Sequence, residues 1–489
     1  MARAARSCHV CKTRKKGCDK ALPQCGSCIQ RGLPCSYYQP DCPHKDERPS
    51  TEISLSDRVP NLISGYSDVN IPATLHFHLG KLLRVTNLSV PRIGERYFRD
   101  LHRGLPILCP TLFRESVAEY KGKTAPVDFS VLLLALCLLA WNPSSDIRSR
   151  PRLIHRDNLY TTVRVLFLRV RAAIRASKSL AQASILIAAY EYASGQPHLA
   201  NRSLEVCTGI MSEIEWKLQN PNELKALPKD RSLRLRVREK VNLWWSVATL
   251  ERIVLCDIPG CNQSLFLQFP CRNTPLPPDL LPAQDHSDLI SLKSGPILAA
   301  THDNSIGGFG RQIQVTYILD QLLKAIQNPT DTTAHIAHLK GLDQELQRLM
   351  AILIRDCDHE WRYYCGAIGT AVRSLFLLHK HIQILPPADP ETLWLQKSSQ
   401  AALDFVTNIM ADVAHDHLQR LTVVNAGVLP LSCAYNLRAS INHIEWQRSV
   451  GRTFSTSSLG SLVALENICF QRWRGDTGVA GPSKASSEV

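Results

Sequence analysis

Six of the 17 cysteines in this 489-residue chain fall within its first 35 residues: Cys8, Cys11, Cys18, Cys25, Cys28 and Cys35. Two cysteines separated by two residues are followed, after a gap of six residues, by a third, and the same spacing then repeats. The other cysteines are scattered without another pair at the two-residue spacing. The array is therefore an internal repeat of one short unit and not a by-product of a cysteine-rich composition.

The repeat has the ligand count of a site for two zinc ions. Each zinc takes four ligands in a tetrahedron, so six sulfurs serve two ions only if two of the sulfurs bridge. Because each half supplies three cysteines, one bridging sulfur per half is the symmetric solution. So short a segment has too few apolar residues to fold without a metal, and we expect metal binding to supply its folding free energy.

Two alternatives stay open at this point. The two closely spaced pairs alone could hold one zinc ion, leaving Cys18 and Cys35 free. A disulfide framework would need an oxidising compartment, but the N-terminal residues MARAARS lack the apolar stretch of a secretory signal. We therefore expect a reducing compartment and a two-zinc cluster.

The segment resembles the fungal binuclear zinc cluster DNA-binding domain, whose six-cysteine pattern it matches without a gap. The resemblance implies two structural zinc ions, with Cys8 and Cys25 as the bridging thiolates. Pro23 matches the loop proline of that family. With every ligand position filled, no position is open for water, and catalysis at the cluster is excluded.

Charge separates the two halves of the cluster. The stretch between Cys11 and Cys18 contains four basic residues and no acidic one, whereas Arg31 is the sole charged residue between Cys28 and Cys35. The whole chain has 57 Lys and Arg against 43 Asp and Glu, which also favours an anionic partner. We expect the first half to face double-stranded DNA and the second half to act mainly as scaffold.

In the family that the segment resembles, the basic pair three and four residues after the second cysteine contacts a CGG-like triplet. These positions are Arg14 and Lys15, and we predict Lys15 as the main base-contacting residue, because lysine and arginine donate to guanine O6 and N7 in the major groove. The residues predicted to contact phosphate are Lys12, Lys16, Arg6 and Lys20. A solvated charge or a nuclear import signal is the alternative for each of them.

Beyond the cluster domain, which is predicted to span residues 1–38, the chain changes character. Residues 39–70 contain prolines and mixed charges without a heptad pattern, which indicates a flexible linker and not a coiled coil. Two modes of DNA binding therefore stay open: as a monomer, and as a homodimer paired through the large domain.

Residues 71–475 are predicted to form an all-helical domain, which makes the chain mostly α, because their apolar residues recur at three- and four-residue steps. The clearest segments are 128–141, 158–176, 179–193, 232–254, 312–326, 336–354 and 367–384. The longest apolar run, 131–141, is too short to cross a bilayer, so no membrane partner is expected. Residues 476–489 are predicted to be a disordered tail.

Three segments of this domain resemble the regulatory region that follows the cluster in fungal proteins. They are residues 184–192, the Trp244–Trp245 pair with Glu251 after it, and residues 277–282. The resemblance implies a regulatory domain that responds to an effector or co-regulator, in a nuclear regulator of RNA polymerase II genes. A secondary-metabolite gene cluster is a common setting for such proteins, and no residue of this chain tests it.

An enzyme and a scaffold without DNA recognition are the competing classes of function. Three His-x-His pairs occur, His76/His78, His379/His381 and His415/His417. They lie in helical or loop contexts in which side chains two residues apart point away from each other, which disfavours a metal site. The glycine-rich turn at 307–310 lacks the strand and the Lys-Ser/Thr of a phosphate-binding loop. The sequence thus predicts a protein that is not an enzyme.

Overall fold

The computed structural model describes residues 7–8, 10–11, 14, 16–21, 24–31, 35, 71–86, 88–141, 156–214, 230–258, 265–277, 296–328, 332–357, 361–386, 390–421, 426–452 and 456–474. Contacts within the chain divide it into two units, Met1–Ile53 and Ser54–Val489. The predicted linker and tail lie outside the described residues, and so do four residues singled out in the cluster: Arg6, Lys12, Lys15 and Pro23.

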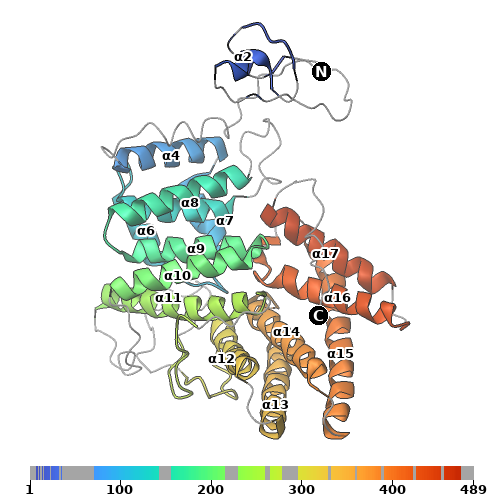
Figure 1. Cartoon of the computed structure of the whole chain (residues 1–489). Helices are drawn as coiled ribbons and strands as arrows, with labels where there is room; N and C mark the ends of the chain where they lie inside the picture. The colour runs from blue at the N-terminus through green and yellow to red at the C-terminus, as the bar shows by residue number, and fades with distance from the viewer. Residues whose placement is uncertain are drawn as a thin grey trace. The chain divides into compact units, whose positions relative to one another are not determined.

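Within these ranges, every regular element of the second unit is a helix, and an isolated bridge joins Pro275 to Ile297 (Figure 1). The elements are α4 (Ile71–Thr86), α5 (Val90–Asp100), α6 (Pro110–Glu119), α7 (Val127–Ala140), α8 (Arg156–Ala173), α9 (Lys178–Ala193), α10 (Pro197–Glu213), α11 (Arg231–Leu255), α12 (Gly308–Gln327), α13 (Thr332–Cys357), α14 (Trp361–Ile384), α15 (Pro390–Arg420), η2 (Ala426–Val428), α16 (Cys433–Ser449) and α17 (Thr456–Arg474). This confirms the all-helical body predicted from the apolar periodicity.

All seven predicted segments fall on helices, with small differences at their ends. Helix α8 ends at Ala173, three residues before the predicted end. The chain turns there because Ser177 adopts an extended backbone, from which its hydroxyl accepts a hydrogen bond from Leu180 N at 3.3 Å and caps α9. No helix among the described residues is both long enough and apolar enough to cross a membrane.

The body has two apolar cores that meet at α12. Helices α4 to α11 enclose the first core, and α13 to α17 enclose the second. Residues of α12 alternate between them: Ile313, Leu319 and Leu323 pack in the first core, and Val315, Ile318 and Leu322 in the second. Trp473, near the end of α17, returns to the first core. The shared helix α12 and the C-terminal end of α17 are therefore two of the links between the two halves of the body.

Helices α7 and α9 form the centre of the first core. Every residue of α7 from Phe129 to Ala140 is buried, as is every residue of α9 from Leu180 to Ala193. A helix that is apolar all round is stable only when it is enclosed on all sides, and α7 packs against α9, α8, α4 and α5. The predicted regulatory-domain segment 184–192 is thus an internal part of the fold.

Two buried arginines, Arg156 and Arg472, and the half-buried Arg96 cap the C-terminal end of α7. The last carbonyl groups of a helix lack partners within it, and the dipole makes this end negative. Here Arg96, Arg156 and Arg472 donate hydrogen bonds to the carbonyl oxygens of residues 138–141 at 2.7–3.2 Å. Burial lowers the pKa of Arg472 to about 9, so its guanidinium stays charged at neutral pH. Helices α5, α8 and α17 are thereby joined to α7.

A second buried charge cluster connects α11 to α12. The Arg252 side chain is fully buried and lies 3.0 Å from an Asp320 carboxylate oxygen and 2.6 Å from Glu251. Lys324 reaches the other oxygen of Asp320 at 2.7 Å. The nearby Trp244–Trp245 pair is buried, with its rings edge to face at 5.1 Å, and belongs to the apolar core.

The glycine-rich turn at 307–310 has a packing role at the start of α12. A Cβ atom at Gly308 would lie 2.0 Å from the Tyr363 carbonyl oxygen at the start of α14. Only glycine lets the two helix backbones approach so closely. This accounts for the turn without a bound phosphate.

Candidate metal centre and nucleic-acid interface

The structure brings the sulfur atoms of all six N-terminal cysteines together. They form two groups of four in which all Sγ atoms lie within 4.8 Å of one another: Cys8, Cys11, Cys18 and Cys25 in one, and Cys8, Cys25, Cys28 and Cys35 in the other. Cys8 and Cys25 belong to both groups. Two four-sulfur sites that share two sulfurs are the arrangement that two tetrahedral zinc ions require of six thiolates.

The sulfur separations fit zinc. Ligands at about 2.3 Å from a tetrahedral ion lie about 3.8 Å from one another. The Cys8 sulfur lies 3.6 Å from that of Cys25 and 3.7 Å from that of Cys28, and the Cys11 and Cys25 sulfurs are 3.7 Å apart. These four cysteines are buried, and Cys18 and Cys35 are half-buried. The donor set and its spacing therefore suit a closed, structural site.

The two halves of the cluster repeat the same local geometry 17 residues apart. The Cys8 backbone N–H points to the Cys18 sulfur at 3.5 Å, and the Cys25 N–H points to the Cys35 sulfur at 3.3 Å. In the second half a short helix, α2 (Gly26–Ile29), follows Cys25. The sequence repeat is thus a structural repeat as well.

The thiols of the cluster differ in pKa. Burial raises the pKa of Cys28 to about 12 and also raises those of Cys8 and Cys11. Burial acts in the same direction on Cys25, but hydrogen bonds from the Cys28 backbone and from the thiols of Cys28, Cys8 and Cys11 outweigh it and lower the pKa of Cys25 to about 6. Metal ligation needs thiolates, so binding of zinc must release protons from the other thiols.

Asp19 connects the two halves and is a residue that the sequence analysis missed. Its carboxylate accepts hydrogen bonds from Gly26 N at 3.0 and 3.1 Å and from Ala21 N at 3.4 Å. A Cβ atom at position 26 would lie 2.8 Å from an Asp19 oxygen. The signal in the sequence was an acidic residue directly after Cys18, followed by a glycine directly after Cys25.

The basic residues that the structure describes lie on the surface of the cluster. Arg14 and Lys16 are exposed and Lys20 is half-buried, with a φ angle of 60°. Arg14 N donates to Val10 O at 3.1 Å, and Lys16 N donates to Cys11 O at 3.0 Å, so both residues are hydrogen-bonded to the segment that contains Cys11. Both side chains are therefore accessible to a partner.

Comparisons with known proteins agree with this geometry. Residues 6–42 match the family described as the fungal Zn(2)-Cys(6) binuclear cluster domain. The N-terminal unit carries such a domain. A Zn(2)-C6 fungal-type transcription factor from Gibberella zeae is 47% identical over 34 residues, which are 7% of this chain and 7% of that protein. The zinc cluster domain binds two zinc ions, and the comparison with the relative covers only a small part of either chain.

The histidine pairs do not form a comparable site. Among the described residues, both groups of three or more metal-ligating side chains are the cysteine groups of the zinc cluster domain. His379 is buried beside Ser399, with 3.2 Å between Nδ1 and Oγ, whereas His381 Nε2 lies 3.1 Å from His335 Nε2. Two neighbouring histidines on α14 thus face different partners, as the geometry of a helix requires.

Proposed function

We propose that this protein is a zinc-dependent transcription regulator that binds double-stranded DNA through its zinc cluster domain. The observation that carries the proposal is the pair of four-sulfur groups sharing Cys8 and Cys25, with the exposed basic side chains of Arg14 and Lys16 nearby in the chain. The relative in Gibberella zeae is described as a transcription factor, which supports the same function here.

In this proposal the six cysteines hold two zinc ions, and the Cys8 and Cys25 thiolates bridge them. Each zinc is then surrounded by four sulfurs, so both ions are structural and the cluster has no catalytic role. We infer that the protein is not an enzyme and acts in the nucleus, which agrees with the function of zinc cluster transcription factors.

The proposed DNA contacts come from the basic residues between Cys11 and Cys18 and from two basic residues that flank them. We propose that Lys15, with Arg14 beside it, contacts the bases of a CGG-like triplet, because such side chains donate to guanine in the major groove. Four residues contact phosphate in this proposal: Lys12, Lys16, Arg6 and Lys20. Phosphate contacts set affinity and its salt dependence, whereas base contacts set sequence preference.

Selection of binding sites from a random DNA library, with the full-length protein at fixed salt, tests the proposal. We expect enrichment of a CGG-like triplet with zinc and loss of the enrichment after a chelator is added. One enriched triplet would indicate a monomer, and two at constant spacing would indicate a homodimer. Binding that depends on salt but enriches no sequence would contradict the proposal and leave only phosphate affinity.

A further inference from the structure

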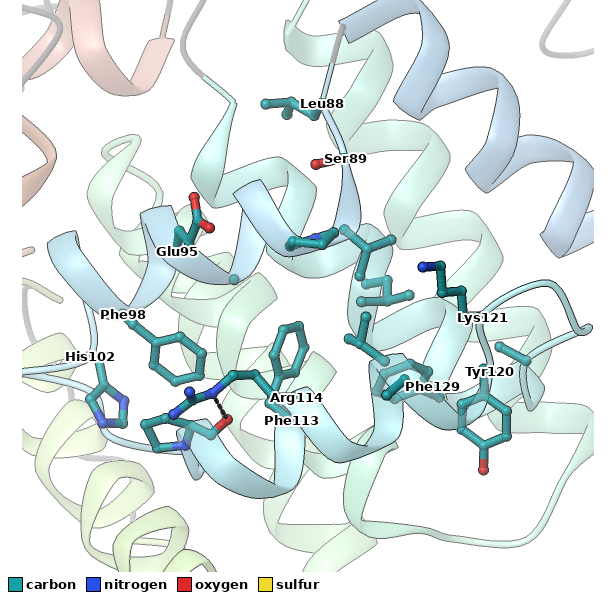
Figure 2. A pocket seen from close by; sticks show the side chains of 18 of the residues that line it. Leu88, Ser89, Glu95, Phe98, His102, Phe113, Arg114, Tyr120, Lys121 and Phe129 are labelled. Carbon is teal, nitrogen blue, oxygen red and sulfur yellow. Dashed lines mark hydrogen bonds between the residues drawn. The ribbon is translucent and has the colours of Figure 1, made fainter. Parts of the chain in front are cut away.

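The helical body contains a large cavity between α4, α5, α6 and the start of α7 (Figure 2). Its volume is about 1340 Å³. Small-molecule sites in proteins usually measure about 300–1,000 Å³, so this space is sufficient for a ligand of considerable size. The cavity lies within the second unit and shares no residue with the zinc cluster domain.

The wall of the cavity is mainly apolar and aromatic. Phe98 from α5, Phe113 from α6 and Phe129 from α7 line it, together with Leu83 from α4 and Leu133 from α7. Figure 2 shows the rings of Phe98 and Phe113 between the two helices that carry them. Their edge-to-face contact, with centroids 5.8 Å apart, fixes the rings in place. Such a wall favours an apolar ligand over a sugar or a nucleotide.

Two buried polar side chains also line the cavity without hydrogen-bond partners. His102 is 7% exposed and Asn242 is 4% exposed. Neither ring nitrogen of His102 has a partner, and the side-chain oxygen of Asn242 has none. Buried polar groups are almost always paired, and leaving them unpaired costs folding free energy. Unpaired groups on the wall of a cavity therefore point to a ligand that supplies the missing partners.

The surroundings of His102 define what the ligand must offer. His102 lies beyond Phe98 at one end of the cavity, and burial, with the nearby Arg238 charge second, lowers its pKa to about 3 (Figure 2). The neutral ring has one N–H donor and one acceptor. Arg238, whose charge acts on His102, lies one turn before Asn242 on α11. The two residues therefore share one face of this helix, and the Asn242 oxygen adds a hydrogen-bond acceptor to that face.

We propose that this cavity binds an apolar small molecule that carries a hydroxyl group at one end. A hydroxyl accepts from the His102 ring N–H and donates to the Asn242 oxygen, and the apolar body of the ligand packs against the phenylalanine rings. The basic side chains that line the cavity, such as Arg103 and Arg114, are exposed to solvent and do not require an anionic ligand. The inference concerns the helical body alone and does not depend on DNA recognition by the zinc cluster domain.

The test uses full-length, zinc-loaded protein and three probes: 4-hexylphenol, its methyl ether and 4-hexylbenzoate. Affinities come from displacement of the dye 1-anilinonaphthalene-8-sulfonate. The ether differs from the phenol by one methyl group on the oxygen and cannot donate a hydrogen bond. We expect the phenol to bind at least about tenfold more tightly than the ether, since about 1.4 kcal/mol from a satisfied hydrogen bond equals a factor of ten. Equal affinity, tighter binding of the benzoate or no displacement would overturn the proposal.

Four variants assign the binding to this cavity. Val117→Trp fills the space and should weaken the phenol and the ether at least about tenfold. His102→Phe keeps the ring contacts with Tyr97 and Phe98, and Asn242→Leu keeps the volume. In both, the preference for the phenol should fall below about twofold, while the melting temperature stays the same or rises because an unpaired polar group is lost.

Thr407→Val, the control, removes a buried unpaired hydroxyl of α15. It should bind all probes as the wild type does.

Binding of the phenol that persists unchanged in Val117→Trp would overturn the assignment to this cavity, as would an unchanged preference in both polar variants. These measurements need no DNA. A negative result would therefore leave the proposed DNA recognition standing, and a failure of the DNA selection would leave this site standing.

Discussion

The zinc cluster domain and the helical body are stabilised by different kinds of interaction. The core of the first is made of cysteine sulfurs, with four buried cysteines and few apolar neighbours. The body instead buries two extended apolar cores and places its charged groups in closed clusters, such as Arg252 with Asp320 and Glu251. One unit therefore depends on a bound metal, and the other folds by removing apolar surface from water.

This difference indicates which kind of function each of the two units can perform. A domain held by metal keeps its surface available, so that basic side chains such as Arg14 and Lys16 are presented on a very short segment. A body with large cores can tolerate a cavity lined by unpaired polar groups, because the rest of the core supplies the stability. Perturbations that act on only one of the two should separate them experimentally.

Zinc removal should have the largest effect. Binding to structural zinc sites contributes about 10–16 kcal/mol to folding, so a chelator should unfold the first unit and abolish sequence-specific DNA binding. Circular dichroism should show that the helical body persists.

Cys8→Ser should act like the chelator, because Cys8 belongs to both sulfur groups. The exposed Cys271→Ser is the matched control and should retain two zinc ions per chain. Equal zinc content in both variants would contradict the bridging role of Cys8.

Breaking the buried charge cluster of the body should come next. Arg252→Met leaves Asp320 and Glu251 buried without their main partner, which should cost about 3–5 kcal/mol in the free energy of unfolding. Urea denaturation of the body, followed in zinc-saturated buffer, measures the loss. Arg272→Met is the control, since Arg272 pairs with Glu345 on the surface and such pairs contribute about 0–1 kcal/mol. If both variants lost the same amount, the cluster would not be a special source of stability.

Removal of the predicted base contact should have an intermediate effect. Lys15→Ala should weaken binding to the preferred sequence by about 1–3 kcal/mol and relax the choice of base in the triplet. Arg31 lies in the second half at the position that repeats Arg14, so Arg31→Ala serves as a control that should keep both affinity and preference. Gel-shift titration on the selected site and on single-base variants measures both quantities. An unchanged preference in Lys15→Ala would assign base contact to another residue.

Loss of a phosphate contact should be the smallest effect. Lys12→Ala should weaken binding to all sequences about equally and reduce the slope of log affinity against log salt by about 1. Titrations at several salt concentrations test this. A loss confined to the preferred triplet would instead place Lys12 among the base-contacting residues.

The amino-acid sequence by itself determined the parts of this protein that depend on local spacing. The cysteine repeat predicts a two-zinc cluster because the number of ligands and their separation along the chain limit which metal site can form. The helices followed from apolar periodicity, since a helical repeat shows in a short window of residues. The histidine pairs could be set aside by the same local argument.

Only the tertiary structure decided what depends on contacts between distant segments. The three arginines at the end of α7 and the Arg252–Asp320 pair join segments that lie far apart along the chain, so no local pattern reveals their proximity. The cavity beside His102 was also absent from the sequence analysis, because a cavity is space left between helices and its unpaired groups become visible only when every neighbour is known. Local spacing encodes ligands and helices, whereas packing decides which polar groups are left without partners.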